Sequence, residues 1–194
     1  ARSIGAGDTK TANQALRQAL IMVTALSLPF IILGTIYAGN CLSFMMVLQE
    51  SPDLEVIDAG VSYMQITIPF MIFALLMMTI NSCLRGAGDT RTPMIVTGIS
   101  NVVNIVGNYF LIFGKGPFPA MGVAGAAWST NLARLIGAVL VVKAVYGGRG
   151  LLSLSIHERF SIDFGIMQRI LRVGFPAAIE QGLMRRAQLV YSMI

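Results

Sequence analysis

Residues 92–114 form the stretch TPMIVTGISNVVNIVGNYFLIFG, which contains no charged side chain. A helix needs about 20 predominantly apolar residues to cross the hydrocarbon core of a bilayer, and this stretch is long enough. Its apolar residues do not alternate with polar ones, as they would in the strands of a membrane β-barrel. The stretch therefore predicts a membrane-spanning helix.

Similar apolar runs extend this prediction to the whole chain. Of the 194 residues, 55% are apolar and 12% are charged, and the charged share is about half that of a soluble domain. We therefore expect an all-α polytopic membrane protein. Its spans are expected over residues 18–49, 59–84, 92–114 and 120–145, with a further span that begins near residue 166 and is cut off by the end of the chain. Three prolines inside these spans are expected to bend their helices: Pro29, Pro69 and Pro176.

The lysine and arginine residues gather in alternate connectors. The segment before residue 18 carries three of them, the connector 50–58 carries none, and the connector 85–91 carries two. Because cytoplasmic loops are enriched in Lys and Arg, we place the first, third and fifth connectors in the cytoplasm. The pattern predicts an integral, multi-pass protein of a prokaryotic-like plasma membrane. The net charge of +5 is then a topology signal rather than a nucleic-acid-binding surface.

A short motif occurs twice. GAGDTKT at residues 5–11 returns as GAGDTRT at residues 86–92. The separation matches one helical hairpin, so the motif marks either a hairpin repeat or two similar glycine-rich turns. Neither copy has the glycine directly before Lys-Ser/Thr that a Walker A phosphate loop needs. Paired carboxylates and metalloprotease or serine-hydrolase motifs are also lacking, so we expect no enzyme and no catalytic residue.

Polar side chains at membrane depth are the candidate functional residues, because they are costly there and usually face a cavity or another polar group. Asn101, Asn104 and Asn108 are spaced three and four apart and share one helix face. Their amide oxygens could coordinate a cation or bind a substrate, or the amides could simply join helices. Further candidates are Tyr63, Asn81, Thr130 and Glu180. Glu180 could exchange a proton, or form a structural ion pair with a nearby arginine.

Four stretches together resemble the multidrug and toxic compound extrusion (MATE) transporters. They are LRGAGDTRTPM at 84–94, the segment from Asn104 through NYFLIFG at 108–114, GVAGAA at 122–127 with Thr130 and Ala133-Arg134, and RVGFPAAIEQ at 172–181. The resemblance implies part of a twelve-helix fold of two six-helix bundles related by pseudo-two-fold symmetry. The chain would hold helices three to seven, with residues 1–147 in the N-terminal bundle, 148–165 as a cytoplasmic linker and 166–194 as the truncated first helix of the C-terminal bundle.

The resemblance also implies a cation site. In family members that have one in the N-terminal bundle, the matching positions here are Tyr63, Asn104, Asn108 and Thr130, with Asn81 in the same cavity. Asn108 stands where those members have an aspartate, and an amide cannot titrate. Proton exchange at this position is therefore not expected. Na⁺ is a possible metal at Asn104 and Asn108, but its binding would be weaker there unless an aspartate on helix one carries it. Glu180 is then the stronger coupling candidate within this chain. No cofactor is expected beyond the coupling ion, Na⁺ or H⁺.

Three functions follow from these observations. The first is exchange of cationic or amphipathic drugs for Na⁺ or H⁺ by alternating access, carried out by a monomer of the full-length protein. The second is a flippase for lipid-linked oligosaccharides from the same superfamily, in which arginines hold a pyrophosphate. Arg134, Arg185 and Arg186 keep that alternative open. The third is a membrane fragment that transports nothing.

Overall fold

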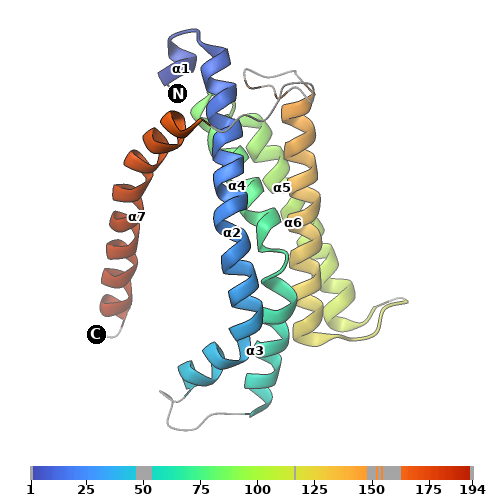
Figure 1. Cartoon of the computed structure of the whole chain (residues 1–194). Coiled ribbons are helices and arrows are strands. Elements are labelled where there is room, and N and C mark those ends of the chain that lie inside the picture. Colours follow the sequence, from blue (N-terminus) through green and yellow to red (C-terminus); the bar gives the residue numbers. More distant parts are fainter. Residues whose placement is uncertain are drawn as a thin grey trace.

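The computed structural model describes residues 2–46, 54–115, 117–147, 152, 154 and 163–192 (Figure 1). These residues form helices and turns, and no strand occurs among them, which confirms the all-α class. The helices are α1 (Arg2–Gly5), α2 (Thr9–Met46), α3 (Leu54–Thr67), α4 (Met71–Gly86), α5 (Arg91–Phe113), α6 (Gly122–Tyr146) and α7 (Phe164–Ser192).

Within the described residues, three helices are long and apolar enough to cross a membrane: Thr9–Ala38 within α2, Arg91–Phe113 and Gly122–Tyr146. A fourth span results when Asp58–Thr67 and Met71–Gly86 are counted as one bent pair. Among the described helices, α7 does not meet the same criterion of length and composition. It carries the charged residues Arg169, Arg172, Glu180, Arg185 and Arg186. The span expected from residue 166 onward therefore stays a prediction.

The span expected over residues 59–84 is broken in its middle. α3 ends at Thr67, α4 begins at Met71, and the two are bent by 54°. Pro69 lies in the break, where it lacks an N–H and its ring clashes with the preceding helical turn. The N–H of Met71 donates to the carbonyl oxygen of Ile68 at 3.0 Å, which tightens the chain at this point. The bend expected at Pro69 is confirmed, whereas α2 and α7 continue as helices through their own prolines.

α6 is the central helix, because it packs against α3, α4 and α5. Many of its buried residues are small, including Gly125, Ala127, Ser129, Ala133 and Gly137. Small residues let the backbones of membrane helices approach closely. The contact with α5 depends on this, since a Cβ atom at Gly125 would collide with the backbone carbonyl of Leu111. α5 and α6 form the most extensive helix pair in the structure.

A hydrophobic core lies at the end of the bundle that carries the N-terminus. Leu16 of α2, Ile80 of α4 and Val141 of α6 are almost fully buried in it. Two leucines from beyond α6, Leu152 and Leu154, are buried in the same cluster. The connector expected over residues 148–165 therefore returns to the bundle at these two leucines.

The two copies of the repeated motif fold into the same turn. Gly7 and Gly88 both have positive φ, 75° and 92°, a conformation that glycine adopts without strain. The Asp8 carboxylate accepts a hydrogen bond from the N–H of Thr11 at 2.9 Å, and Asp89 accepts one from the N–H of Thr92 at 3.0 Å. These bonds cap the first turns of α2 and α5. Both copies therefore share one local structure, which the hairpin repeat and the two similar glycine-rich turns predict alike.

α7 stands apart from the other helices along most of its length (Figure 1). It contacts α2. Near its start, Ile170 lines a groove whose other walls include residues of α1, α2 and α4. From Leu171 to Gln188 the described side chains are exposed. Its apolar residues therefore have few partners within the described part of this chain.

Candidate functional site

Three predicted site residues lie together between α5 and α6. The Nδ2 atom of Asn108 donates to Oδ1 of Asn104 at 3.2 Å, and Nδ2 of Asn104 donates to Oγ1 of Thr130 at 3.2 Å. The hydroxyl of Ser129 donates to the backbone carbonyl of Asn104 at 2.8 Å. We call Asn104, Asn108, Ser129 and Thr130 the amide network. It joins the C-terminal half of α5 to the N-terminal half of α6.

The sequence of α5 explains why the amides meet. Asn104 and Asn108 are one helical turn apart, so their side chains are neighbours on one face. Gly107 lies between them and faces α6, where an added Cβ would stand 2.5 Å from the Ser129 hydroxyl oxygen. The missing side chain lets α6 come close enough for both hydrogen bonds to Asn104. Asn101, the third amide of the predicted stripe, is exposed and lies outside the network.

One acceptor of the amide network is left open. Oδ1 of Asn108 is buried and has no hydrogen-bond partner. A buried polar group without a partner costs about 1–3 kcal/mol, so this oxygen is available to a ligand, as are the buried Oδ1 atoms of Asn81 and Asn131. An amide oxygen can take a cation or a hydrogen-bond donor, but it cannot release a proton. The network can therefore bind either kind of ligand without changing its own charge.

Tyr63 lies outside the amide network. It is half-buried on α3 and lines an open groove of about 560 Å³ between α3 and the start of α6. Glu55, Gly60 and Met64 of α3 share this groove with Val123 of α6. Among the described residues, no hydrogen bond joins Tyr63 to Asn104 or Asn108. What connects them is the packing of α3 against α6.

Asn81 and Glu180 are also separate from the amide network. Asn81 is 5% exposed on α4, next to the core residue Ile80, and its Oδ1 has no hydrogen-bond partner. Glu180 lies on the exposed part of α7, as do Arg185 and Arg186. Of the six predicted residues, the structure thus brings together Asn104, Asn108 and Thr130, and leaves Tyr63, Asn81 and Glu180 in other places.

Two residues missed as site candidates contribute to this region. Ser129 and Asn131 flank Thr130, and both have fully buried side chains. Nδ2 of Asn131 donates to the backbone carbonyl of Ile66 on α3 at 2.7 Å. A run of three polar residues in an apolar span was visible in the sequence. It did not say that Ser129 and Thr130 bond to Asn104 of α5, whereas Asn131 bonds to α3.

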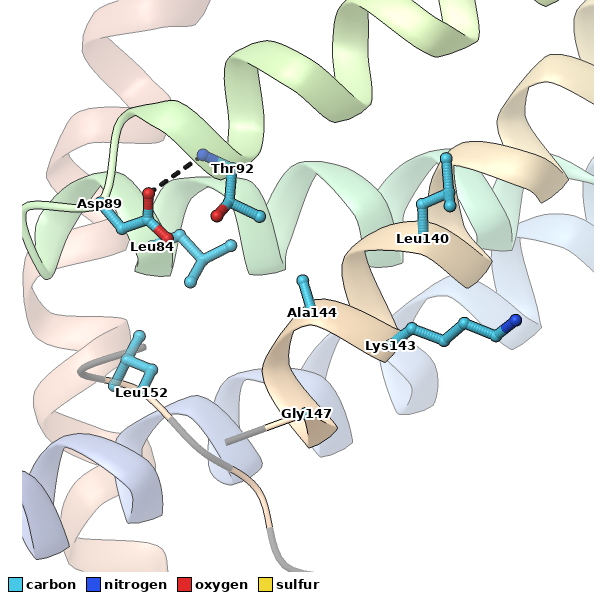
Figure 2. Close-up of a pocket in the computed structure, with 8 residues that line it drawn as sticks. All are labelled: Leu84, Asp89, Thr92, Leu140, Lys143, Ala144, Gly147 and Leu152. Atoms are coloured by element: carbon cyan, nitrogen blue, oxygen red, sulfur yellow. Dashed lines mark hydrogen bonds between the residues drawn. The ribbon is translucent and has the colours of Figure 1, made fainter. Parts of the chain in front are cut away.

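A separate cavity of about 490 Å³ lies at the turn between α4 and α5 (Figure 2). Asp89 and Thr92 line one side, and Lys143, Gly147 and Leu152 line the other. Figure 2 shows the Lys143 side chain extended away from Asp89. The hydrogen bond from the Thr92 N–H holds the pKa of Asp89 below its ordinary value. This aspartate is therefore occupied as a helix cap.

No cluster of three or more His, Cys, Asp or Glu side chains suited to a metal ion occurs in the described part of the chain. Amide and hydroxyl oxygens are a different donor set. In the amide network they come from Asn104, Asn108 and Thr130. Alkali cations are bound by oxygen donors of this kind, so the residues fit such an ion chemically.

Comparisons with known proteins agree with the fold. The chain is 32% identical to the probable multidrug resistance protein NorM of Thermotoga maritima, over 100% of this chain and 40% of that protein. It is 31% identical to the FAD transporter of Shewanella oneidensis, over 73% of this chain and 31% of that protein. The chain thus spans less than half the length of these relatives.

A solved structure supports the same assignment. An inward-facing multidrug resistance MATE family transporter of the MOP superfamily matches with a TM-score of 0.80 and 25% identity, over 93% of this chain and 39% of that one. With the apolar helices, these matches identify an integral, multi-pass membrane protein. The family model named MatE matches residues 1–110, more than half of the sequence. The chain belongs to the MatE family.

Proposed function

We propose that the whole gene product exports small cationic or amphipathic molecules in exchange for Na⁺ or H⁺ by alternating access. It would act as a monomer and without a further cofactor. The observation that carries the proposal is the open oxygen of Asn108 in a hydrogen-bonded network within an apolar helix pair. The similarity to proteins named as multidrug resistance transporters supports it.

The amide network suits Na⁺ better than H⁺. Asn104 and Asn108 supply neutral oxygens, which can replace water around a cation but cannot hold a titrating proton. Oδ1 of Asn108 would hold the cation, and Oδ1 of Asn104 could join it, because an amide oxygen has two lone pairs and that of Asn104 uses one to accept from Asn108. A cation bound in this way would favour whichever transport conformation binds it more tightly.

Glu180 is the group that would carry proton coupling. It is the only carboxylate side chain of α7, and carboxylates within membrane spans commonly take part in proton relays. In the described structure Glu180 is exposed, about one turn after Pro176. Its effect on transport would separate a proton-coupled protein from a sodium-coupled one.

The test is efflux of an amphipathic cationic dye from vesicles that contain the whole gene product, with an imposed Na⁺ or pH gradient. We expect gradient-driven efflux, with at least a tenfold loss in Asn104→Ala if Na⁺ couples, or in Glu180→Gln if H⁺ couples. Asn101→Ala is the matched control, because this exposed amide lies on the same helix outside the network. Equal loss in all three variants, or efflux without any gradient, would contradict the proposal.

An anionic substrate is the second candidate. One relative is named as an FAD transporter, and FAD carries a pyrophosphate. Arg134 is half-buried on α6, where it could meet such a group. Uptake or efflux of FAD, or of a lipid-linked pyrophosphate, in place of the dye would favour this class and the flippase alternative. A folded, inserted protein that moves neither class would support the non-transporting alternative.

A further inference from the structure

The break between α3 and α4 leaves a backbone group that needs a partner. In an uninterrupted helix the carbonyl of Ile66 would accept a hydrogen bond from the N–H of Phe70. The helix stops at Thr67 and Pro69 lies in the break, so that bond belongs to a helical turn that is absent. In a membrane protein, an open carbonyl of this kind has to be satisfied by another part of the protein.

Asn131 of α6 supplies the partner. Its Nδ2 lies 2.7 Å from the carbonyl oxygen of Ile66, and its side chain is 0% exposed. The other atom of the amide, Oδ1, has no hydrogen-bond partner. The side chain of Asn131 therefore hydrogen-bonds through its Nδ2 atom to Ile66, and this bond joins α6 to α3.

A second contact between α6 and the break supports the same interpretation. The ring of Phe70 meets the ring of Trp128 edge to face, with 5.8 Å between centroids and 72° between planes. Trp128 and Asn131 are three residues apart, so they lie on the same side of α6. One helix face thus holds the break on both sides of Pro69, through an amide and an aromatic ring.

The same short segment of α6 also carries the amide network. Ser129 and Thr130 bind Asn104 of α5, and the next residue, Asn131, binds α3. Tyr63 lies one helical turn before Ile66 on α3. The bond from Asn131 therefore sets the position of the helix that carries Tyr63 relative to the helix that carries Thr130.

We propose that Asn131 is a positioning residue, which fixes the bend between α3 and α4 and thereby places Tyr63 relative to the amide network. The inference rests on the proposed function only for the role of the amide network in transport. The effect of Asn131 on the position of α3 is independent of that function, because this position can be measured without transport. Removing the donor should let α3 rotate about the break at Pro69.

The test measures the distance between spin labels on α3 and α6 in the whole gene product. Val56 and Val139 are exposed and suit the labels, and every native cysteine of the whole gene product, Cys41 and Cys83 among them, is first replaced by alanine. Val56 lies ten residues before Ile66, about 15 Å along the helix. A change of about 10° in the bend would therefore move the label by about 2–3 Å.

The variants are Asn131→Leu, which keeps the branched shape at a somewhat larger volume and removes the donor, and Ser129→Ala as the matched control. Ser129 is equally buried on the same helix, but its hydroxyl donates to α5 rather than to α3. We expect Asn131→Leu to shift or broaden the distance distribution and Ser129→Ala to leave it as in the wild type. An unchanged distribution in a folded Asn131→Leu, or the same shift in both variants, would overturn the proposal.

Asn131→Ala is the second variant if the leucine variant does not fold, because it removes the donor without the risk of overpacking. It is judged by the same criterion. If neither variant folds while Ser129→Ala does, Asn131 acts in folding and the positioning role is wrong. A wild type that transports nothing would remove the proposed function, but the distance measurement would still decide the role of Asn131.

Discussion

The helices α5, α6 and α7 are all long, but they differ in how many contacts they make with the rest of this chain. α5 and α6 meet through small residues, and their polar side chains find one another. α7 contacts mainly α2, and its side chains are exposed from Leu171 onward. A site can therefore be assembled from residues of the α5–α6 pair alone. Glu180 on α7 lacks comparable neighbours within the described chain.

The largest expected effect contrasts one glycine in each region. In Gly125→Ala the new Cβ meets the backbone of Leu111, whereas in Gly174→Ala it meets nothing within 4 Å. We expect Gly125→Ala to lower the free energy of unfolding by about 1–3 kcal/mol. Gly174→Ala should be neutral or stabilising by up to about 1 kcal/mol, because alanine favours a helix. Thermal unfolding of the purified chain in detergent measures both, and equal losses would remove the contrast.

The second prediction compares the caps that begin α5 and α7. Asp89 accepts from the N–H of Thr92, and Asp163 accepts from the N–H groups of Gly165 and Ile166. Asp89→Ala should cost about 1 kcal/mol of bundle stability, the usual value of an N-cap. Asp163→Ala should fray α7 and leave the main unfolding transition in place. Circular dichroism of both variants tests this; a shift of the main transition in Asp163→Ala would contradict it.

The cap of α5 also gives a pH dependence with a definite sign. The pKa of Asp89 lies below its ordinary value of 3.8, mainly because the backbone N–H of Thr92 donates to the charged carboxylate. Its contribution is therefore complete above that value and is lost as the pH falls through the lower folded-state pKa. The stability difference between wild type and Asp89→Asn should be constant above about pH 5 and shrink in stronger acid. A stability difference between wild type and Asp89→Asn that grows as the pH falls would contradict this prediction.

A smaller effect is expected within the amide network. Thr130→Val removes the acceptor for Asn104 while keeping the shape of the side chain. Hydrogen bonds between membrane helices contribute about 0.6 kcal/mol on average. We expect a loss of that order, against no measurable change for Glu180→Gln on exposed α7. A double-mutant cycle with Asn104→Ala should show that the effects of residues 104 and 130 are not additive.

The membrane-helix class could be predicted from the sequence because most of the spans are long, continuous stretches without charged residues, which are local features of the chain. The repeated GAGDT turns could be predicted for the same reason, since the glycine and the capping aspartate act within a few residues. Pro69 predicted a bend in the span. It could not predict that the span divides into two helices, because the division also depends on contacts with α6 on both sides of Pro69.

The candidate site could be predicted only in part. The spacing of Asn104 and Asn108 placed them on one face, and Thr130 came from the family resemblance. The partners of Asn131 and Ser129 depend on helix packing across 65 and 25 residues of sequence, which no local pattern encodes. Tyr63 and Glu180 lie on helices whose positions are set by other helices. Their roles therefore stay predictions.

The most direct test of the account is whether Na⁺ stabilises the whole gene product through the amide network. Thermal unfolding in detergent is followed while NaCl replaces choline chloride at constant ionic strength, for the wild type, Asn108→Leu and Asn101→Leu. A ligand that binds the folded state raises the unfolding temperature, and the rise grows with the logarithm of the ligand concentration relative to Kd. We predict the rise in the wild type and in Asn101→Leu, and its loss in Asn108→Leu. The same rise in all three proteins, or none in the wild type, would contradict a sodium site at Asn104 and Asn108.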